Sequence, residues 1–310
     1  MSSLEIQKPA SASSGLGNKL VLGKLLHQSR NEIRLAFCPE THEYFAVKTF
    51  PYDQGKVSSH FLNESRFSFL DNKHVISMKD VSSDGAYELV GAKPGNSYLV
   101  MELAPFGNFY DLLTSKRVRP DEKLARTYFR QLIEGIEYLH AHGVAHLDLK
   151  PHNLLIGNNF QLKIADFDLA FLNGDSYIRS KGTKFHRAPE MIDGTCQQPE
   201  AADIFSCGTV LFLLKSGGVL PQTEEICPKG INTYELLQRD NDKFWELHEE
   251  LKKDHPGFYS KEFKALFNWM TKEDPNERPT ILEIKSTEWY NGEIYSNDEL
   301  EVIMRNYLGI

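Results

Sequence analysis

Hydrophobic residues in the first third of the chain come in short runs rich in β-branched and aromatic side chains, separated by polar stretches. The clearest runs lie at residues 44–50 and 98–103, and their composition is typical of β-strands. Between them, residues 60–70 carry apolar side chains with a spacing acceptable for one helix. Residues 19–103 therefore predict a small β-rich unit that contains a single helix.

The pattern turns helical after a break at residues 105–108, Pro-Phe-Gly-Asn. Apolar residues in the stretch 124–139 recur at i and i+4 with partners at i+1, a core-facing stripe that ends at Gly143. We therefore expect an α+β fold of two lobes joined by a hinge, the second lobe larger and helical. The expected boundaries are an N-lobe at 19–101, a hinge at 102–107 and a C-lobe at 108–290.

The two ends of the chain carry different patterns. Residues 1–18 are rich in Ser, Ala and Gly and lack an apolar run, which predicts a flexible tail and neither a signal peptide nor a membrane anchor. Residues 291–310 contain a capping box, Ser296 to Glu299, followed by an amphipathic stripe. Such stripes usually pack, so we expect a helix docked on the helical lobe, with a regulatory partner or autoinhibition as the alternative.

Composition narrows the classes of function. The 310 residues are 41% hydrophobic and 25% charged, as in ordinary soluble globular proteins. The net charge of −8 argues against nonspecific nucleic-acid binding and against an anionic membrane surface. The four cysteines lack C-x-x-C spacing, so no zinc site or disulfide framework is indicated. A reducing compartment fits best, and we expect an intracellular, cytoplasmic protein, with the nucleus also open.

Two carboxylates, an amide and a lysine stand together in the middle of the chain. The motif H-L-D-L-K-P-H-N at residues 146–153 is followed by D-F-D-L-A at residues 166–170. Asn153 and Asp166 offer hard oxygen ligands suited to Mg²⁺. The first motif alone is moderately specific, because small-molecule phosphotransferases carry similar loops. The two motifs at this separation strongly indicate a metal-bound nucleotide held beside a hydroxyl acceptor.

These motifs resemble the H-x-D-x-K-x-x-N catalytic loop and the D-F-G metal motif of eukaryotic protein kinases. The resemblance covers about residues 19–290. It extends to A-V-K at 46–48, G-T-x-x-x-x-A-P-E at 182–190 and D-x-x-S-x-G at 203–208. The wording of the catalytic loop, with Thr183, is similar to serine/threonine kinases, and residues 125–140 look most like the calcium/calmodulin-dependent kinase-related branch.

The resemblance implies transfer of the γ-phosphoryl group of ATP, with Mg²⁺, to Ser and Thr hydroxyls of protein substrates. It makes Asp148 the group that orients the acceptor hydroxyl and takes its proton, and Lys150 the group that neutralises charge on the transferred phosphoryl. It assigns the metal to Asn153 and Asp166, and a buried structural ion pair to Glu190 and Arg278. The nucleotide-binding residues that it implies are Lys48 with its partner Glu64, the gatekeeper Met101, the backbone of Glu102 and Ala104, and Ser29 and Arg30 over the phosphates.

Several positions depart from the family pattern. The phosphate-covering loop, residues 27–33, has no glycine, and Arg30 is our candidate to compensate as a point charge. Leu147 replaces an arginine that would bind a phosphorylated activation segment, so we expect activity independent of that phosphorylation. Asp168 replaces glycine and either adds a metal ligand or repels the triphosphate. Ser68 is small where relatives place a large apolar residue, which should loosen the helix.

The departures keep a rival open: a pseudokinase scaffold that binds partners, with or without nucleotide, and does not turn over. We favour the active enzyme because the residues that contact phosphate or metal are all retained. A small-molecule phosphotransferase is disfavoured by the A-P-E and D-x-x-S-x-G segments, which shape a peptide-binding platform. Relatives that prefer basic peptides carry Glu where this chain has Asn108 and His152, so we expect no strong preference for an upstream arginine.

Overall fold

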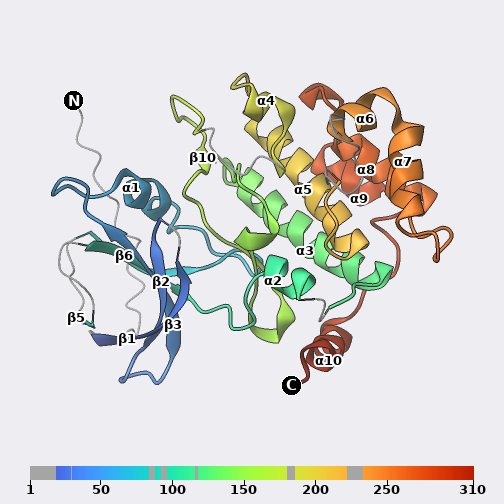
Figure 1. The fold of residues 1–310 in the computed structure, drawn as a ribbon. Coiled ribbons are helices and arrows are strands. Elements are labelled where there is room, and N and C mark those ends of the chain that lie inside the picture. Colours follow the sequence, from blue (N-terminus) through green and yellow to red (C-terminus); the bar gives the residue numbers. More distant parts are fainter. Residues whose placement is uncertain are drawn as a thin grey trace.

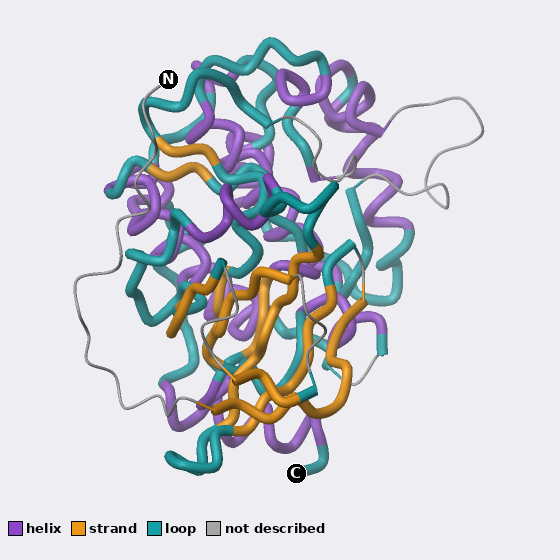
Figure 2. The backbone as a smooth tube through the Cα atoms, turned by 90° about the vertical axis from the view of Figure 1, so that its left-hand side faces the viewer, coloured by secondary structure: helices purple, strands orange, loops and turns teal. Residues whose placement is uncertain are grey.

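The computed structural model describes residues 19–28, 30–83, 88–91, 96–115, 118–179, 186–221 and 233–310. The chain has the expected α+β fold of two lobes, a small one built on a β-sheet and a larger helical one (Figure 1). Figure 2 looks at the molecule from the side of the sheet, whose strands lie in front of the helices. The expected N-terminal tail lies outside the described residues.

In the described residues, the small lobe is built on a six-stranded sheet with the order β4-β6-β3-β2-β1-β5. Its strands pair antiparallel except for β1 and β5, which are parallel. The two strands expected from the sequence are β3 and β6, which lie side by side near the middle of the sheet. The strand bounds are β1 Lys19–Gln28, β2 Glu32–Phe37, β3 Tyr44–Pro51, β4 Met78–Ser82, β5 Glu88–Val90 and β6 Asn96–Glu102.

Consecutive side chains of β3 point to opposite faces of the sheet, and the residues between its ends are buried on both faces. Phe45 and Val47 pack into a core on one face, whereas Ala46 and Phe50 pack on the other face with Phe61. Lys48 shares the second face through the two-residue period of a strand. The alternation in β3 therefore directs the lysine towards the helix that covers this face.

That helix is α1, Ser59–Ser65, and it is shorter than the helix expected over residues 60–70. Its N-cap is Ser58, whose side chain accepts the His60 N–H, and an edge-on contact of 5.6 Å between the rings of Phe50 and Phe61 fixes the helix on the sheet. Beyond Ser65 the backbone tightens into turns, and the N–H of Phe67 bonds to the carbonyl of Glu64. The expectation of a longer helix was wrong because these turns direct Phe67 into the core.

The large lobe is centred on α3, Glu122–Ala141, and α5, Pro199–Ser216, which pack against each other. Helix α3 begins at its cap Asp121 and buries the predicted apolar stripe, and Gly143 follows its end with a φ of 69°. Helix α5 is buried on nearly all sides. The remaining helices are α2 Phe109–Thr114, α4 Pro189–Ile192, α6 Thr233–Arg239, α7 Asn241–Glu250, α8 Lys261–Met270, α9 Ile281–Ser286 and α10 Asn297–Leu308.

Short strands and single turns surround the segment between the lobes. Strand β7 pairs with β10, and β8 pairs with β9, so that two small antiparallel sheets flank the motif residues. The bounds are β7 Val144–Ala145, β8 Leu154–Ile156, β9 Leu162–Ile164 and β10 Phe171–Leu172, with 3-10 turns at η1 Pro151–Asn153, η2 Asn158–Phe160 and η4 Pro275–Glu277.

The C-terminal helix α10 docks on the large lobe, as the sequence predicts. Leu300 and Met304 are fully buried in the main core, and the Tyr307 hydroxyl donates to the Arg119 carbonyl at 2.9 Å. The predicted capping box is present at its start. The helix also contacts η2, where Phe160 stacks on Phe106 of the expected hinge with ring centroids 4.3 Å apart.

Among the helices of the described ranges, none combines the length and the apolar character that a membrane span requires.

Candidate active site

Three predicted residues meet where the lobes face each other. Lys48 Nζ on β3 lies 2.6 Å from Glu64 Oε2 on α1 and 2.8 Å from Asp166 Oδ1, which follows β9. Lys48 is 6% exposed and Glu64 1% exposed. The fold thus brings one cation and two carboxylates into contact, although Lys48 and Asp166 are 118 residues apart in the sequence.

Burial and charge act against each other on this network. Burial disfavours the charge of Lys48, but the carboxylates of Glu64 and Asp166 outweigh it and raise the pKa of the ammonium above its usual value. Burial raises the pKa of the Glu64 carboxyl to about 7, although Lys48 opposes this shift. Burial also opposes ionisation of Asp166, but Lys48 prevails and lowers the pKa of that carboxyl. Lys48 therefore keeps its proton and Asp166 its charge, as binding of phosphate and metal requires.

The second group of predicted residues surrounds Asp148 in the loop between β7 and η1. Lys150 Nζ lies 2.6 Å from Asp148 Oδ2, and Asn153 Nδ2 donates to the same oxygen at 3.1 Å and to the Asp148 carbonyl at 2.9 Å. A cation and an amide thus orient the carboxylate. The structure brings together Asp148, Lys150 and Asn153.

Asp203, the first residue of the D-x-x-S-x-G motif, holds this loop from α5. It is fully buried, and its carboxylate oxygens accept the backbone N–H groups of His146 and Leu147, each at 2.8 Å. His140 also contacts it, with Nε2 3.0 Å from Oδ2. A buried carboxylate with several donors is firmly oriented, so it fixes the backbone just before Asp148.

The D-F turn points its phenylalanine into the core and its aspartate towards Lys48. Asp166 has a φ of 68°, a conformation that non-glycine residues adopt only when their surroundings impose it. The Phe167 ring lies 5.6 Å from that of Phe67 and 5.2 Å from that of His146. Phe67 thus fills the position for which Ser68 was the expected, undersized filler, and that expectation was wrong.

The metal-binding prediction fits the oxygen donors present. Within the described ranges, no cluster of three or more His, Cys, Asp or Glu side chains could hold a metal by itself. Asp166 and Asn153 supply a carboxylate and an amide, and the Asp166 side chain is 39% exposed. Such a pair fits an ion that takes its remaining ligands from phosphate oxygens and water, as Mg²⁺ does.

The carboxylate of Asp168 pairs with α1. His60 Nδ1 lies 2.6 Å from Asp168 Oδ1, and Arg30 in the β1–β2 turn reaches His60 Nε2 at 2.6 Å. Both contacts are satisfied when Nδ1 carries the proton, donates to Asp168 and leaves Nε2 to accept from Arg30. Asp168 is thus engaged by a side chain, and Arg30 lies close to it at 3.9 Å. Ser29, the other predicted phosphate-loop residue, lies outside the described residues.

The predicted base-binding segment comprises the end of β6 and the residues just after it. Met101 is 8% exposed and pairs in register with Ala46, the first residue of the A-V-K motif. The Glu102 carboxylate accepts from Lys163 Nζ at 2.8 Å and from the Ser77 N–H at 2.7 Å. Its side chain is therefore occupied, which is compatible with a role for its backbone. The nucleotide contacts of Met101, Glu102 and Ala104 stay predictions.

The expected peptide platform is present in part. Arg278 donates to both oxygens of Glu190 at 2.6 and 2.8 Å, and both side chains are buried. Leu147 is 4% exposed and packs with Ala188 and Phe205 in an apolar cluster. A phosphate would find no cation at Leu147. The G-T dipeptide at 182–183 lies outside the described residues.

Sequence reasoning missed polar residues in α1 and at its C-cap, and their partners. Asn63 Nδ2 donates to the Asp168 carbonyl at 2.5 Å, and the Arg66 guanidinium forms a two-bond ion pair with Asp175. The partners are 105 and 109 residues apart in the chain, which no local pattern reveals. The only available signal was the spacing of His60, Asn63 and Glu64 at i, i+3 and i+4, which places them on one helical face.

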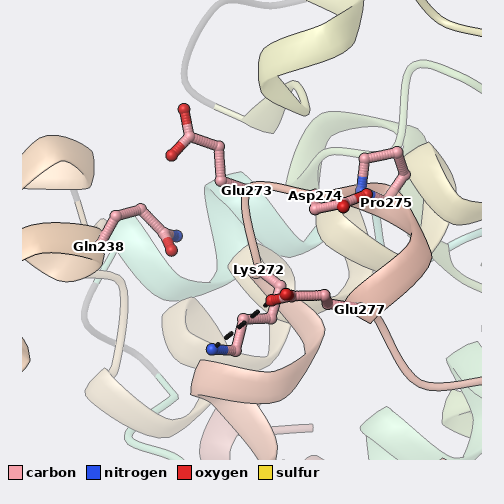
Figure 3. A pocket seen from close by; sticks show the side chains of 6 residues that line it. All are labelled: Gln238, Lys272, Glu273, Asp274, Pro275 and Glu277. Carbon is pink, nitrogen blue, oxygen red and sulfur yellow. Dashed lines mark ion pairs between the residues drawn. The ribbon is translucent and has the colours of Figure 1, made fainter.

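A separate surface pocket lies on the large lobe. It is lined by Gln238, Lys272, Glu273, Asp274, Pro275 and Glu277 (Figure 3). Lys272 and Glu277 form an ion pair across it at 3.9 Å. Its lining contains no residue of the catalytic loop or the D-F turn, so it is distinct from the candidate site.

Comparison with known proteins gives a consistent result. A family model described as "Protein kinase domain" matches residues 30–290. The SNF1-like protein kinase ssp2 of Schizosaccharomyces pombe is 30% identical over 282 residues, which are 89% of this chain and 44% of that protein. The serine/threonine protein kinases OSK3 and OSK4 of Oryza sativa subsp. indica are each 34% identical over 207 residues, 66% of this chain and 37% of theirs. The chain thus spans less than half the length of these relatives.

Proposed function

The chain belongs to the protein kinase family, in the serine/threonine class of its relatives, and on this premise we propose that it transfers the γ-phosphoryl group of Mg·ATP to Ser and Thr hydroxyls of proteins. The observation that carries the proposal is the Lys48–Glu64–Asp166 network, in which Lys48 lies 2.6 Å from Glu64 within the small lobe and 2.8 Å from Asp166 across to the large lobe. We further propose that it belongs to the calcium/calmodulin-dependent kinase-related branch and works inside the cell, where ATP is available.

In the proposed reaction Lys48 binds the α- and β-phosphates, and Glu64 keeps its ammonium in place. Asp166 and Asn153 hold the metal, which when bound neutralises charge on the phosphates. Asp148 accepts a hydrogen bond from the acceptor hydroxyl and takes its proton as the new O–P bond forms and the bond to the leaving phosphate breaks. Lys150, 2.6 Å from Asp148, balances charge on the group in transfer.

Three of the departures that favoured the pseudokinase alternative have neighbours compatible with an active enzyme. The position that Ser68 left small is filled by Phe67, whose ring lies 5.6 Å from that of Phe167. Asp168 pairs with His60 at 2.6 Å, so its carboxylate accepts a hydrogen bond from a neighbouring side chain. Leu147 is packed in an apolar cluster. The departures at Ser68, Asp168 and Leu147 therefore each have a neighbour that suits them.

The proposed substrates are proteins without a strongly basic upstream segment. Asn108 caps α2 and its amide donates to the Asp111 carboxylate at 2.8 Å. His152 stacks on Tyr110 with ring centroids 4.0 Å apart, and burial, followed by the charge of Lys150, lowers the pKa of its imidazole. Neither predicted specificity position offers a carboxylate to a substrate arginine.

The test is phosphate transfer from labelled Mg·ATP to a mixed protein substrate by the full chain and by Asp148→Asn. We expect transfer by the wild type and a loss of kcat by about 10²–10⁴-fold in the variant, because a positioned proton acceptor contributes that much. ATP should still shift the melting temperature of both proteins. Asp274→Asn, at the separate surface pocket, is the matched control and should keep full activity. Equal transfer by wild type and Asp148→Asn, or none by either, would refute the proposal.

A further inference from the structure

Helix α1 is too short to hold its own position. It contains seven residues, and helices of that length are unstable without tertiary contacts. Glu64 lies on this helix, so the distance of 2.6 Å between Lys48 and Glu64 depends on whatever anchors α1. Phe61 anchors one side of the helix on the sheet. The other contacts that fix it reach across to the large lobe.

The strongest of these contacts joins Arg66, at the end of α1, to Asp175. The guanidinium donates to Asp175 Oδ1 at 2.6 Å through one nitrogen and to Oδ2 through the other. The second nitrogen also reaches the Ala170 carbonyl at 3.5 Å. The side chains are 27% and 17% exposed, so water screens the pair only in part. The hydrogen bond from Arg66 is the main cause that lowers the pKa of the Asp175 carboxyl.

Asp175 connects this contact to the catalytic loop. Its Oδ2 accepts the N–H of Leu172 at 3.0 Å, which fixes it to the end of β10. In β10, Leu172 pairs with Val144 and Phe171 pairs with Ala145 of β7. Strand β7 leads directly into the loop that carries Asp148. The ion pair thus ties α1 to the strand next to the catalytic loop.

A second contact supports the same helix one turn earlier. His60 and Asn63 both bind Asp168, through its carboxylate at 2.6 Å and its carbonyl at 2.5 Å. Together, Arg66–Asp175 and His60/Asn63–Asp168 are called the α1 clamp here. The clamp consists of side chains and backbone of the chain itself.

We propose that Arg66 and Asp175 are positioning residues, which hold α1 so that Glu64 orients Lys48 for catalysis. The carboxylate of Asp175 serves as the anion that anchors the helix. Arg179 lies 4.0 Å from the same carboxylate and adds a second cation, but from within the same segment, so it does not link the lobes. The proposal rests on the proposed kinase function, because the orientation of Lys48 affects turnover only if Lys48 binds the phosphates of ATP.

The experiment compares Arg66→Gln, Asp175→Asn and the double variant of the full chain. Each single variant should lower kcat about tenfold, as expected when a partly buried charged hydrogen-bond pair is lost and α1 spends most of its time displaced. The double variant should resemble the single ones, because the two residues act through one contact. Asp175→Glu keeps the charge and should recover most of the activity. Lys264→Gln, which breaks an ion pair with Glu249 between α8 and α7, is the control and should leave kcat unchanged.

Hydrogen exchange of the α1 amides gives a readout that does not need turnover. Both single variants should exchange faster than wild type over residues 59–65, and Lys264→Gln should not. The proposal would be overturned if the effects of the two single variants on kcat multiplied in the double variant. It would also be overturned if the variants had a lower melting temperature but the same kcat and the same α1 exchange as wild type. If the wild type itself transfers no phosphate, the proposed function fails, and hydrogen exchange then tests the clamp separately. Faster exchange of the α1 amides in the variants would support the clamp, and unchanged exchange would reject it.

Discussion

Replacing Leu147 by arginine restores the residue type usual in the family, and the structure predicts that it damages this protein. Leu147 is 4% exposed, has a φ of 60° and packs against Ala188, Met191 and Phe205. The nearby carboxylate of Asp203 already accepts two backbone N–H groups at 2.8 Å and contacts His140. An introduced guanidinium would therefore enter an apolar site whose buried acid is already engaged.

The magnitude follows from the burial of Leu147. Losing the buried leucine removes about 1.5–3 kcal/mol of hydrophobic stabilisation. Forcing a longer side chain into the cluster adds about 1–3 kcal/mol. We expect Leu147→Arg to lower the free energy of unfolding by about 3–5 kcal/mol, within the range of severe core substitutions. Leu147→Met conserves volume and polarity and should lose less than about 1.5 kcal/mol.

Urea unfolding followed by the fluorescence of the three tryptophans measures this difference through the midpoint and slope of the transition. Turnover of each protein is measured before and after phosphatase treatment, and the wild type should be unaffected by the treatment. The reasoning is refuted if Leu147→Arg is as stable as Leu147→Met and its kcat becomes dependent on phosphorylation. That result would mean that the activation segment accepts a cation at this position.

Two further predictions concern buried charge and pH. Arg278→Met should lower the free energy of unfolding by about 3–5 kcal/mol, because Glu190 is left buried without its partner. Adding Glu190→Leu should recover much of this loss, and the urea midpoints of the single and double variants measure both effects. His248 is fully buried among Phe212 and Phe244, and burial lowers the pKa of its imidazole from 6.5 to about 4. Between these pH values the unfolded chain binds a proton that the folded chain does not, so stability should fall as the pH drops from 6.5 towards 4. His248→Phe should reduce this acid sensitivity in urea titrations at pH 7 and pH 5, and an unchanged pH dependence would contradict the argument.

The sequence predicts the parts of the site whose positions follow from local rules. The two-residue period of β3 places Lys48 on the face covered by α1, and the predicted partner Glu64 lies 2.6 Å away. The capping box at Ser296 and the apolar stripe behind it predict α10 and its docking, which the burial of Met304 confirms. In these cases the hydrophobic pattern and the end signals of the element agree with the final packing.

Other features depend on contacts that no local pattern contains. The end of α1 was placed too late because the helical spacing continues past Ser65, whereas packing of Phe67 on Phe167 favours tighter turns. The pair Arg66–Asp175 joins residues 109 apart, and each residue alone reads as an ordinary surface charge. The sequence leaves Asp168 either as an added metal ligand or as a group that repels the triphosphate, because its partner His60 is identified only when the lobes are assembled.

The docking of α10 means that the segment matched by the family model is shorter than the segment that forms the packed core. The family match ends at residue 290, but Trp289, Leu300 and Met304 belong to one buried cluster. A version of the protein cut at the family boundary would expose the apolar surface that α10 covers and should aggregate more readily. The same cut would remove Arg305 from the face of Phe160, whose other neighbour is Phe106 of the hinge segment. For recombinant work, a version of this protein that keeps the large-lobe core covered therefore extends at least to residue 308.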